Sequence, residues 1–174
     1  MGIELKNITK RFGDTLALNN INLNFDQPKI YGLLGNNGAG KTTMLNIISN
    51  RIFPDSGEVI VDDEQALDND CALNKIFMLS EKNLYPDGMK VERAFEEAAN
   101  FYQNFQMDQA LEMAKQFGLK TRKKINTLST GYTSIFKLIV ALNVNTPYLL
   151  LDEPVLGLDA QHRDLFYKLL LEKY

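Results

Sequence analysis

The 174-residue chain is predicted to adopt an α/β fold with a parallel core sheet, an N-terminal antiparallel β subdomain and an inserted helical subdomain. Two apolar runs, Ile76–Leu79 and Tyr148–Leu151, alternate with segments of helical periodicity, which is typical of parallel sheets joined by crossover helices. The first 30 residues instead alternate as strands do, and helical patterns dominate residues 84–142, where we expect the helical subdomain.

The N-terminal elements follow from periodicity and turn residues. Ile3, Leu5 and Ile8 indicate one strand, and alternating apolar residues from Leu16 to Phe25 indicate a second, with Gly13 and Asp14 supplying the turn. Residues 29–34 are a short apolar run of the kind that a buried parallel strand shows. Apolar residues then recur at helical spacing from Lys41 to about Phe53, and residues 58–61 resemble another strand.

The remaining elements alternate between strand and helix. After the strand Ile76–Leu79, we expect helices over residues 91–105 and from an Asp108 cap to Gly118. A further helix follows residues 128–131 and stops before Pro147, and the strand Tyr148–Leu151 comes next. The last helix begins at about Asp159, so helices separate the predicted core strands.

Composition excludes several classes of protein. Nineteen Lys and Arg residues against 22 Asp and Glu residues give a net charge of −3, which weighs against a dedicated nucleic-acid binder. Cys71 is the only cysteine, so neither an internal disulfide nor a cysteine-based zinc site is expected. No apolar run approaches the roughly 18 residues that a membrane-spanning helix requires.

A phosphate-binding pattern stands between the predicted strand at residues 29–34 and the helix that follows it. Residues 35–42 fit G-x-x-x-x-G-K-[ST], in which glycines let backbone N–H groups turn inward and the lysine adds a positive charge. The threonine hydroxyl is suited to Mg²⁺. We assign nucleoside triphosphate binding to Gly35, Asn36, Asn37, Gly38, Ala39, Gly40, Lys41, Thr42 and Thr43.

Two carboxylates end the apolar strand Tyr148–Leu151. Ligands of open parallel sheets bind at the carboxyl ends of the strands, which is where Asp152 and Glu153 stand. We predict that Asp152 holds Mg²⁺ and that Glu153 orients and deprotonates the water that attacks the γ-phosphate. An isolated Asp-Glu pair favours a solvated loop, and the phosphate-binding pattern in the same chain reverses that preference.

Together with Leu128-Ser129-Thr130-Gly131-Tyr132 and Gly157-Leu158-Asp159, these segments make the chain resemble an ABC-type ATPase over nearly its whole length. The resemblance implies that Phe12 stacks on adenine, although a core position in the β subdomain is the alternative. It implies that Ser129 and Gly131 contact the γ-phosphate bound to a second protomer, although Ser129 also fits a simple helix cap. Asp159 would communicate across that interface or merely cap the last helix.

The resemblance also implies cofactors and partners. ATP and Mg²⁺ would be enclosed between this domain and a second ABC ATPase domain, in a homodimer or heterodimer. A separate transmembrane permease would dock on residues 84–124 through Leu84, Tyr85 and Phe95, although these residues could instead only pack their own helices. Docking of this kind places the protein in the cytoplasm on the inner face of the membrane. The alternatives are a regulatory or nucleic-acid-associated ABC ATPase without a permease, and a P-loop kinase of small molecules.

Several positions depart from the family pattern. Glu81 stands where glutamine is usual, and a carboxylate can still ligate Mg²⁺ and take part in catalysis. This exchange resembles ABC-2-type exporters, whereas Thr130 and Tyr132 replace the commoner glycine and glutamine. The switch histidine is absent, because the only histidine, His162, is expected on the surface of the last helix. We therefore expect a single nucleotide-binding domain over residues 1–174, without its C-terminal end, that binds Mg-ATP but hydrolyses it slowly.

Overall fold

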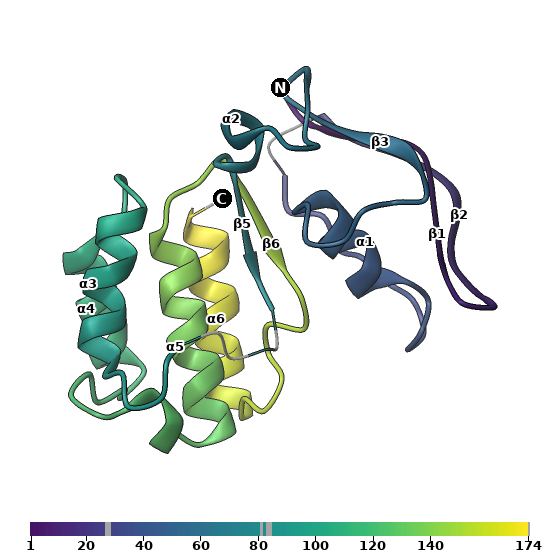
Figure 1. Cartoon of the computed structure of the whole chain (residues 1–174). Coiled ribbons are helices and arrows are strands. Elements are labelled where there is room, and N and C mark those ends of the chain that lie inside the picture. Colours follow the sequence, from purple (N-terminus) through teal and green to yellow (C-terminus); the bar gives the residue numbers. More distant parts are fainter. Residues whose placement is uncertain (27–28, 81, 83–84, 174) are drawn as a thin grey trace. The chain divides into compact units, whose positions relative to one another are not determined.

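A computed structural model describes the chain except for residues 27–28, 81, 83–84 and 174. The described residues form two compact units, residues 1–76 and residues 77–173. Each unit has its own secondary structure and its own buried side chains (Figure 1).

The first unit contains a four-stranded antiparallel sheet in the order β2-β1-β3-β4. Strands β1 (Ile3–Phe12) and β2 (Thr15–Phe25) form a long hairpin, with β3 (Ser56–Val61) paired to β1 and β4 (Glu64–Gln65) paired to β3 (Figure 1). Apolar residues from three of these strands are buried: Ile3, Leu5, Ile8, Leu18, Val59 and Val61. The predicted N-terminal antiparallel subdomain is thereby confirmed.

Two helices complete the first unit. Helix α1 (Lys41–Ile48) buries Met44, Ile47 and Ile48 and contacts β2. It ends five residues before the predicted Phe53, because Asn50 adopts a left-handed backbone (φ 55°) that cannot continue a helix. The short α2 (Asp70–Leu73) begins at Asn69, whose side chain accepts a hydrogen bond from the Ala72 amide at 3.2 Å.

The strand predicted for residues 29–34 is not formed. Residues 29–34 lie outside any helix or strand, and Leu34 is 93% exposed. Backbone N–H and C=O groups stay in a strand only if a neighbouring strand pairs with them, and no described strand does so here. The prediction was wrong because apolar composition reports a tendency to be buried and cannot supply a neighbouring strand. Tyr31 still packs edge-on against Phe25, with ring centroids 5.0 Å apart.

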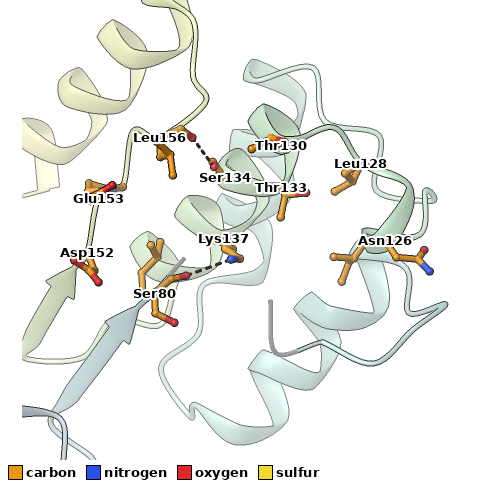
Figure 2. A pocket seen from close by; sticks show the side chains of 13 residues that line it. Ser80, Asn126, Leu128, Thr130, Thr133, Ser134, Lys137, Asp152, Glu153 and Leu156 are labelled. Atoms are coloured by element: carbon orange, nitrogen blue, oxygen red, sulfur yellow. Dashed lines mark hydrogen bonds between the residues drawn. The ribbon is translucent and has the colours of Figure 1, made fainter. Parts of the chain in front are cut away.

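The second unit is built around a two-stranded parallel sheet. Strands β5 (Ile76–Leu79) and β6 (Tyr148–Leu151) lie side by side with their carboxyl ends at the same edge (Figure 2). The Asp152 amide extends this pairing by donating to the Leu79 carbonyl at 3.1 Å. Helices α5 (Thr130–Asn143) and α6 (Ala160–Lys173) pack together beside the sheet (Figure 1).

The other helices of the second unit lie between β5 and α5 in the sequence. Helices α3 (Val91–Phe101) and α4 (Met107–Gln116) are neighbours, and a 3-10 turn, η1 (Ile125–Thr127), leads into α5. Both helices begin or end differently from the prediction. Helix α3 stops at Phe101, before residue 105, and α4 is preceded by Gln106, so Asp108 lies in the first turn and is not the cap.

Aromatic side chains fill the core of the second unit. Phe95 and Phe136 are both fully buried and stack with ring centroids 5.9 Å apart. Tyr85 lies edge-on to Phe136 at 4.8 Å, and burial raises the pKa of Tyr85 to about 12. Phe95 and Tyr85 therefore pack within their own unit, which corrects the expectation that they dock a permease, and Leu84 lies outside the described residues.

Replacing Phe95 with alanine is expected to lower the free energy of unfolding of the second unit by about 3–5 kcal/mol, because a large buried ring is removed from a packed core. Phe101→Ala is the matched control on the same helix, since Phe101 is 80% exposed and should change stability by less than about 0.5 kcal/mol. Denaturant unfolding followed by circular dichroism measures both effects. Equal effects of the two substitutions would contradict this description of the core.

Candidate functional site

The glycine-rich loop of residues 35–42 folds back on itself before α1. The Ala39 amide donates to the Asn36 carbonyl at 3.1 Å. The Lys41 ammonium donates to the Gly35 carbonyl at 2.7 Å and to the Asn36 carbonyl at 2.9 Å. The positive charge of Lys41 is therefore held over the loop, where it could exchange these carbonyl oxygens for phosphate oxygens.

Gly40 sets the position at which α1 begins. Its backbone is left-handed (φ 87°), and a Cβ atom there would lie 2.6 Å from the Ala17 carbonyl oxygen and 2.8 Å from Leu18 Cδ2. Only glycine fits this close approach to β2. Because Gly40 has no side chain to cap the helix, the first amides of α1 are suited to an anion such as a phosphate.

Phe12 and Thr42 lie in the same unit as this loop. Phe12 is paired with Thr15 at the end of the hairpin, is 48% exposed, and has the Lys10 ammonium 5.5 Å from its ring centroid. An exposed aromatic ring of this kind is suited to stacking on a base. Thr42 belongs to the first turn of α1, and its carbonyl accepts a hydrogen bond from the Asn46 side chain at 2.7 Å.

The acidic pair lies in the second unit, directly after β6. Asp152 is half-buried and Glu153 is exposed. Glu153 has a left-handed backbone (φ 47°), and among the described non-glycine residues with positive φ it alone is neither Asn nor Asp, the two types that adopt this conformation most readily. The Leu156 amide donates to the Glu153 carbonyl at 3.1 Å, which closes a turn immediately after the strand.

A cavity of about 420 Å³ separates the acidic pair from the beginning of α5. Figure 2 shows Asp152 and Glu153 on one side, Thr130, Thr133 and Ser134 on α5, and Ser80 at the end of β5. The side chain of Lys137 projects from α5. All the remaining residues from 135 to 143 are buried. Its ammonium donates to the carbonyls of Ser80 at 3.2 Å and Lys82 at 3.0 Å, and so ties the segment after β5 to α5.

The segment of residues 129–134 packs against the loop of residues 153–159 in the same chain. Ser129 caps α5 by accepting a hydrogen bond from the Tyr132 amide at 3.4 Å, as the local pattern allowed. The Ser134 hydroxyl donates to the Leu156 carbonyl at 2.8 Å. A Cβ atom on Gly131 would lie 2.8 Å from the Gly157 carbonyl oxygen, so the two backbones touch.

The prediction that His162 lies on the surface of the last helix was only partly right, because its ring also packs against two aromatic side chains. Its ring stacks on Phe117 at 6.0 Å and lies edge-on to Tyr132 at 6.3 Å, and its side chain is only 27% exposed. Its amide and Nδ1 contact the two carboxylate oxygens of Asp159 at 2.9 and 2.8 Å. Asp159 thus caps α6, and the backbone hydrogen bond from His162 holds the pKa of Asp159 below its usual value. The Asp-x-x-His spacing at a helix start is the signal that could have revealed this pair.

Across the described residues, no group of three or more His, Cys, Asp or Glu side chains could hold a metal ion. Mg²⁺ needs only one or two protein ligands when phosphates supply the rest. The Thr42 hydroxyl in the first unit is of the right chemistry, and so, within the second unit, is the Asp152 carboxylate. Glu81, the third predicted ligand, lies outside the described residues.

Known proteins resemble this chain over nearly all of its length. "ABC transporter ATP-binding protein YtrB" of Bacillus subtilis (strain 168) is 29% identical over 98% of the chain and 59% of its own length. "Nod factor export ATP-binding protein I" of Burkholderia lata is 34% identical over 95% of the chain and 57% of its own length. The chain therefore spans less than two thirds of either relative.

Solved structures resemble the fold as well. A dimeric bacterial ABC transporter cassette, MJ0796, is 30% identical and superimposes with a TM-score of 0.82 over 97% of this chain and 81% of its own. Its post-hydrolysis dimer bound to ADP and Pi gives a TM-score of 0.81 at 29% identity, over the same shares of the two chains. These matches confirm the predicted fold class, with its antiparallel and parallel sheets.

Within the described parts of the chain, no helix is both long and apolar enough to span a membrane. The family model described as "ABC transporter" matches residues 18–156, which include the glycine-rich loop, residues 128–132 and the acidic pair. Because that match covers most of the sequence, the chain belongs to the ABC transporter family, and its fold is that of the family's ATP-binding cassettes.

Proposed function

We propose that this chain is the ATP-binding and ATP-hydrolysing part of a transporter, working as a head-to-tail dimer with a second ATPase domain. The observation that carries the proposal is the loop of residues 35–42. Three features of the loop favour a triphosphate. They are the positive charge of Lys41, the close packing of Gly40 against β2, and the N-terminus of α1, which has no side-chain cap. Membership of the ABC transporter family supports the same ligand.

The proposed ATP site uses the residues of the first unit. The amides of residues 35–43 and the Lys41 ammonium would hold the phosphates, and the Phe12 ring would stack on adenine. The Thr42 hydroxyl would ligate Mg²⁺, which when bound neutralises charge on the β- and γ-phosphates. The exposed ring of Phe12 supports this role, because a core position would leave it buried.

Hydrolysis is assigned to the carboxylates that follow the parallel strands. Asp152 would ligate Mg²⁺, and Glu153 would orient the attacking water and accept its proton. The left-handed backbone of Glu153 supports a role for its side chain, because strain of this kind is retained where function needs it. Glu81 is proposed as a further ligand of Mg²⁺ on the basis of sequence alone.

Ser129 and Gly131 are proposed to meet the γ-phosphate of a nucleotide bound to the partner domain. Ser129 is exposed at the beginning of α5, where a helix N-terminus favours an anion. The dimeric state of the similar cassette MJ0796 supports this arrangement. Of the two relatives named above, one is named for export and the other, YtrB, for neither direction of transport, so the proposal covers ATP-driven transport as a class. It includes a separate transmembrane permease and a place on the cytoplasmic face of the membrane.

Lys41→Ala should weaken Mg-ATP binding by about 10- to 100-fold, because hydrogen bonds from a charged group are lost at the phosphates. Isothermal titration calorimetry measures the affinity. Lys168→Ala is the matched control, because Lys168 lies on α6 with its side chain 71% exposed. This variant should bind Mg-ATP as tightly as the unchanged protein does. Equal affinity of the Lys41→Ala variant and the control would refute the assigned phosphate loop.

Glu153→Gln should retain ATP binding and slow hydrolysis by about 100-fold or more, because the amide cannot accept the proton from water. The variant should accumulate as an ATP-bound dimer, which light scattering after size exclusion detects. A strictly monomeric Glu153→Gln protein at saturating ATP would contradict the proposed sandwich.

Ser129→Arg, added to Glu153→Gln, should weaken the ATP-dependent dimer by at least about tenfold, because a bulky charge is forced into the closed interface. Gln109→Arg in the same background is the control, because Gln109 is exposed on α4. Sedimentation velocity with and without Mg-ATP compares the two. Dimerisation that is equally strong in both variants would exclude Ser129 from the interface.

A further inference from the structure

We propose that His162 is a positioning residue that holds the loop of residues 153–159, the Asp159 loop, against the beginning of α5. Contact of Ser129 and Gly131 with a nucleotide is thereby transmitted to Asp159. The inference rests on the proposed dimer. His162 joins three segments that are distant in the sequence: the end of α4 through Phe117, the beginning of α5 through Tyr132, and the beginning of α6 through Asp159.

The polar half of this connection fixes a carboxylate in one orientation. The His162 amide donates to Asp159 Oδ1 at 2.9 Å, and Nδ1 lies 2.8 Å from Oδ2. Because an ionised carboxylate only accepts hydrogen bonds, Nδ1 must carry the proton. Both carboxylate oxygens are therefore held by one residue, and the Asp159 side chain cannot rotate without breaking a bond to His162.

The apolar half of the connection holds the ring itself. The ring is nearly parallel to the fully buried Phe117, with an interplanar angle of 22°, and it is inclined at 60° to Tyr132. Phe117 belongs to the core and gives the ring a rigid support. Tyr132 lies three residues after Ser129 and donates its amide to the Ser129 hydroxyl, so a movement of Ser129 reaches the histidine in two steps.

Two further contacts join the beginning of α5 to the segment of residues 153–162, so that a movement of one segment displaces the other. The Ser134 hydroxyl is bonded to the Leu156 carbonyl, and the backbones of Gly131 and Gly157 touch. Residues 129–134 and 153–162 are thus in contact at three places along their length. A displacement at the beginning of α5 must move the Asp159 loop or break these contacts.

A role in packing alone predicts a different outcome from a role in positioning. The Asp159 side chain is 65% exposed, so its bond to His162 adds little to the core, whereas the ring on Phe117 adds packing. His162→Phe keeps the ring and removes Nδ1. His162→Asn keeps a donor at the place of Nδ1 and removes the ring.

The test measures ATP-dependent dimerisation in the Glu153→Gln background by sedimentation velocity, and ATP binding by calorimetry. Both His162→Phe and His162→Asn should weaken the dimer about tenfold, because each breaks one half of the connection. Lys168→Asn, on the exposed face of the same helix, is the control and should dimerise normally. Full dimerisation of His162→Phe would reduce His162 to packing and overturn the proposal.

A second measurement uses the unchanged histidine, whose ring gives a single set of proton NMR signals because it is the only histidine in the chain. In Glu153→Gln protein these signals should shift when Mg-ATP forms the dimer. They should stay in place when Ser129→Arg is added, although ATP still binds. Signals that do not move on dimerisation overturn the proposal. Absence of any ATP binding to the unchanged protein would instead refute the proposed function, and with it the dimer on which this inference depends.

Discussion

The close approach of Gly40 to β2 is the constraint on which the candidate site depends. A loop that binds an anion through its amides turns its backbone at positions where side chains would collide. At Gly40 the Ala17 carbonyl leaves no room for a Cβ atom. The left-handed Gly40 then starts α1 without a side-chain cap, and Lys41 follows at once with its charge over the loop. One steric requirement thus sets where α1 begins and places Lys41 directly after the turn.

The sequence predicted best those features that depend on neighbours along the chain. The β1–β2 hairpin, the Ser129 cap and the glycine-rich loop all follow from patterns within a few residues, and the structure has the hairpin and the cap where they were expected. The strand prediction for residues 29–34 was wrong because strand formation requires a partner strand, which no local pattern can report. The roles assigned to Phe12, Ser129 and Glu153 in binding and hydrolysis stay predictions.

Other features were missed because they arise from contacts between distant segments. The burial of Phe95 and Tyr85 depends on Phe136, about 40 and 50 residues further along the chain, so both looked as suitable for a partner surface as for a core. Lys137 is the one charged residue of α5, and only the structure pairs it with the carbonyls that follow β5. The strain at Glu153 is a backbone property for which a glutamate gives no sequence signal.

The departures from the family pattern gain a physical reason from the contacts within the second unit. The resemblance implies that Thr130 and Tyr132 stand in place of a commoner glycine and glutamine, and both lie against the segment of residues 157–162. The Cγ2 methyl of Thr130 lies 3.1 Å from where a Cβ atom on Gly157 would be, and the Tyr132 ring lies against His162. A methyl group and an aromatic ring thus lie where segments 129–134 and 153–162 approach each other. Ser129, which together with Gly131 is proposed to reach a second protomer, is exposed beside them.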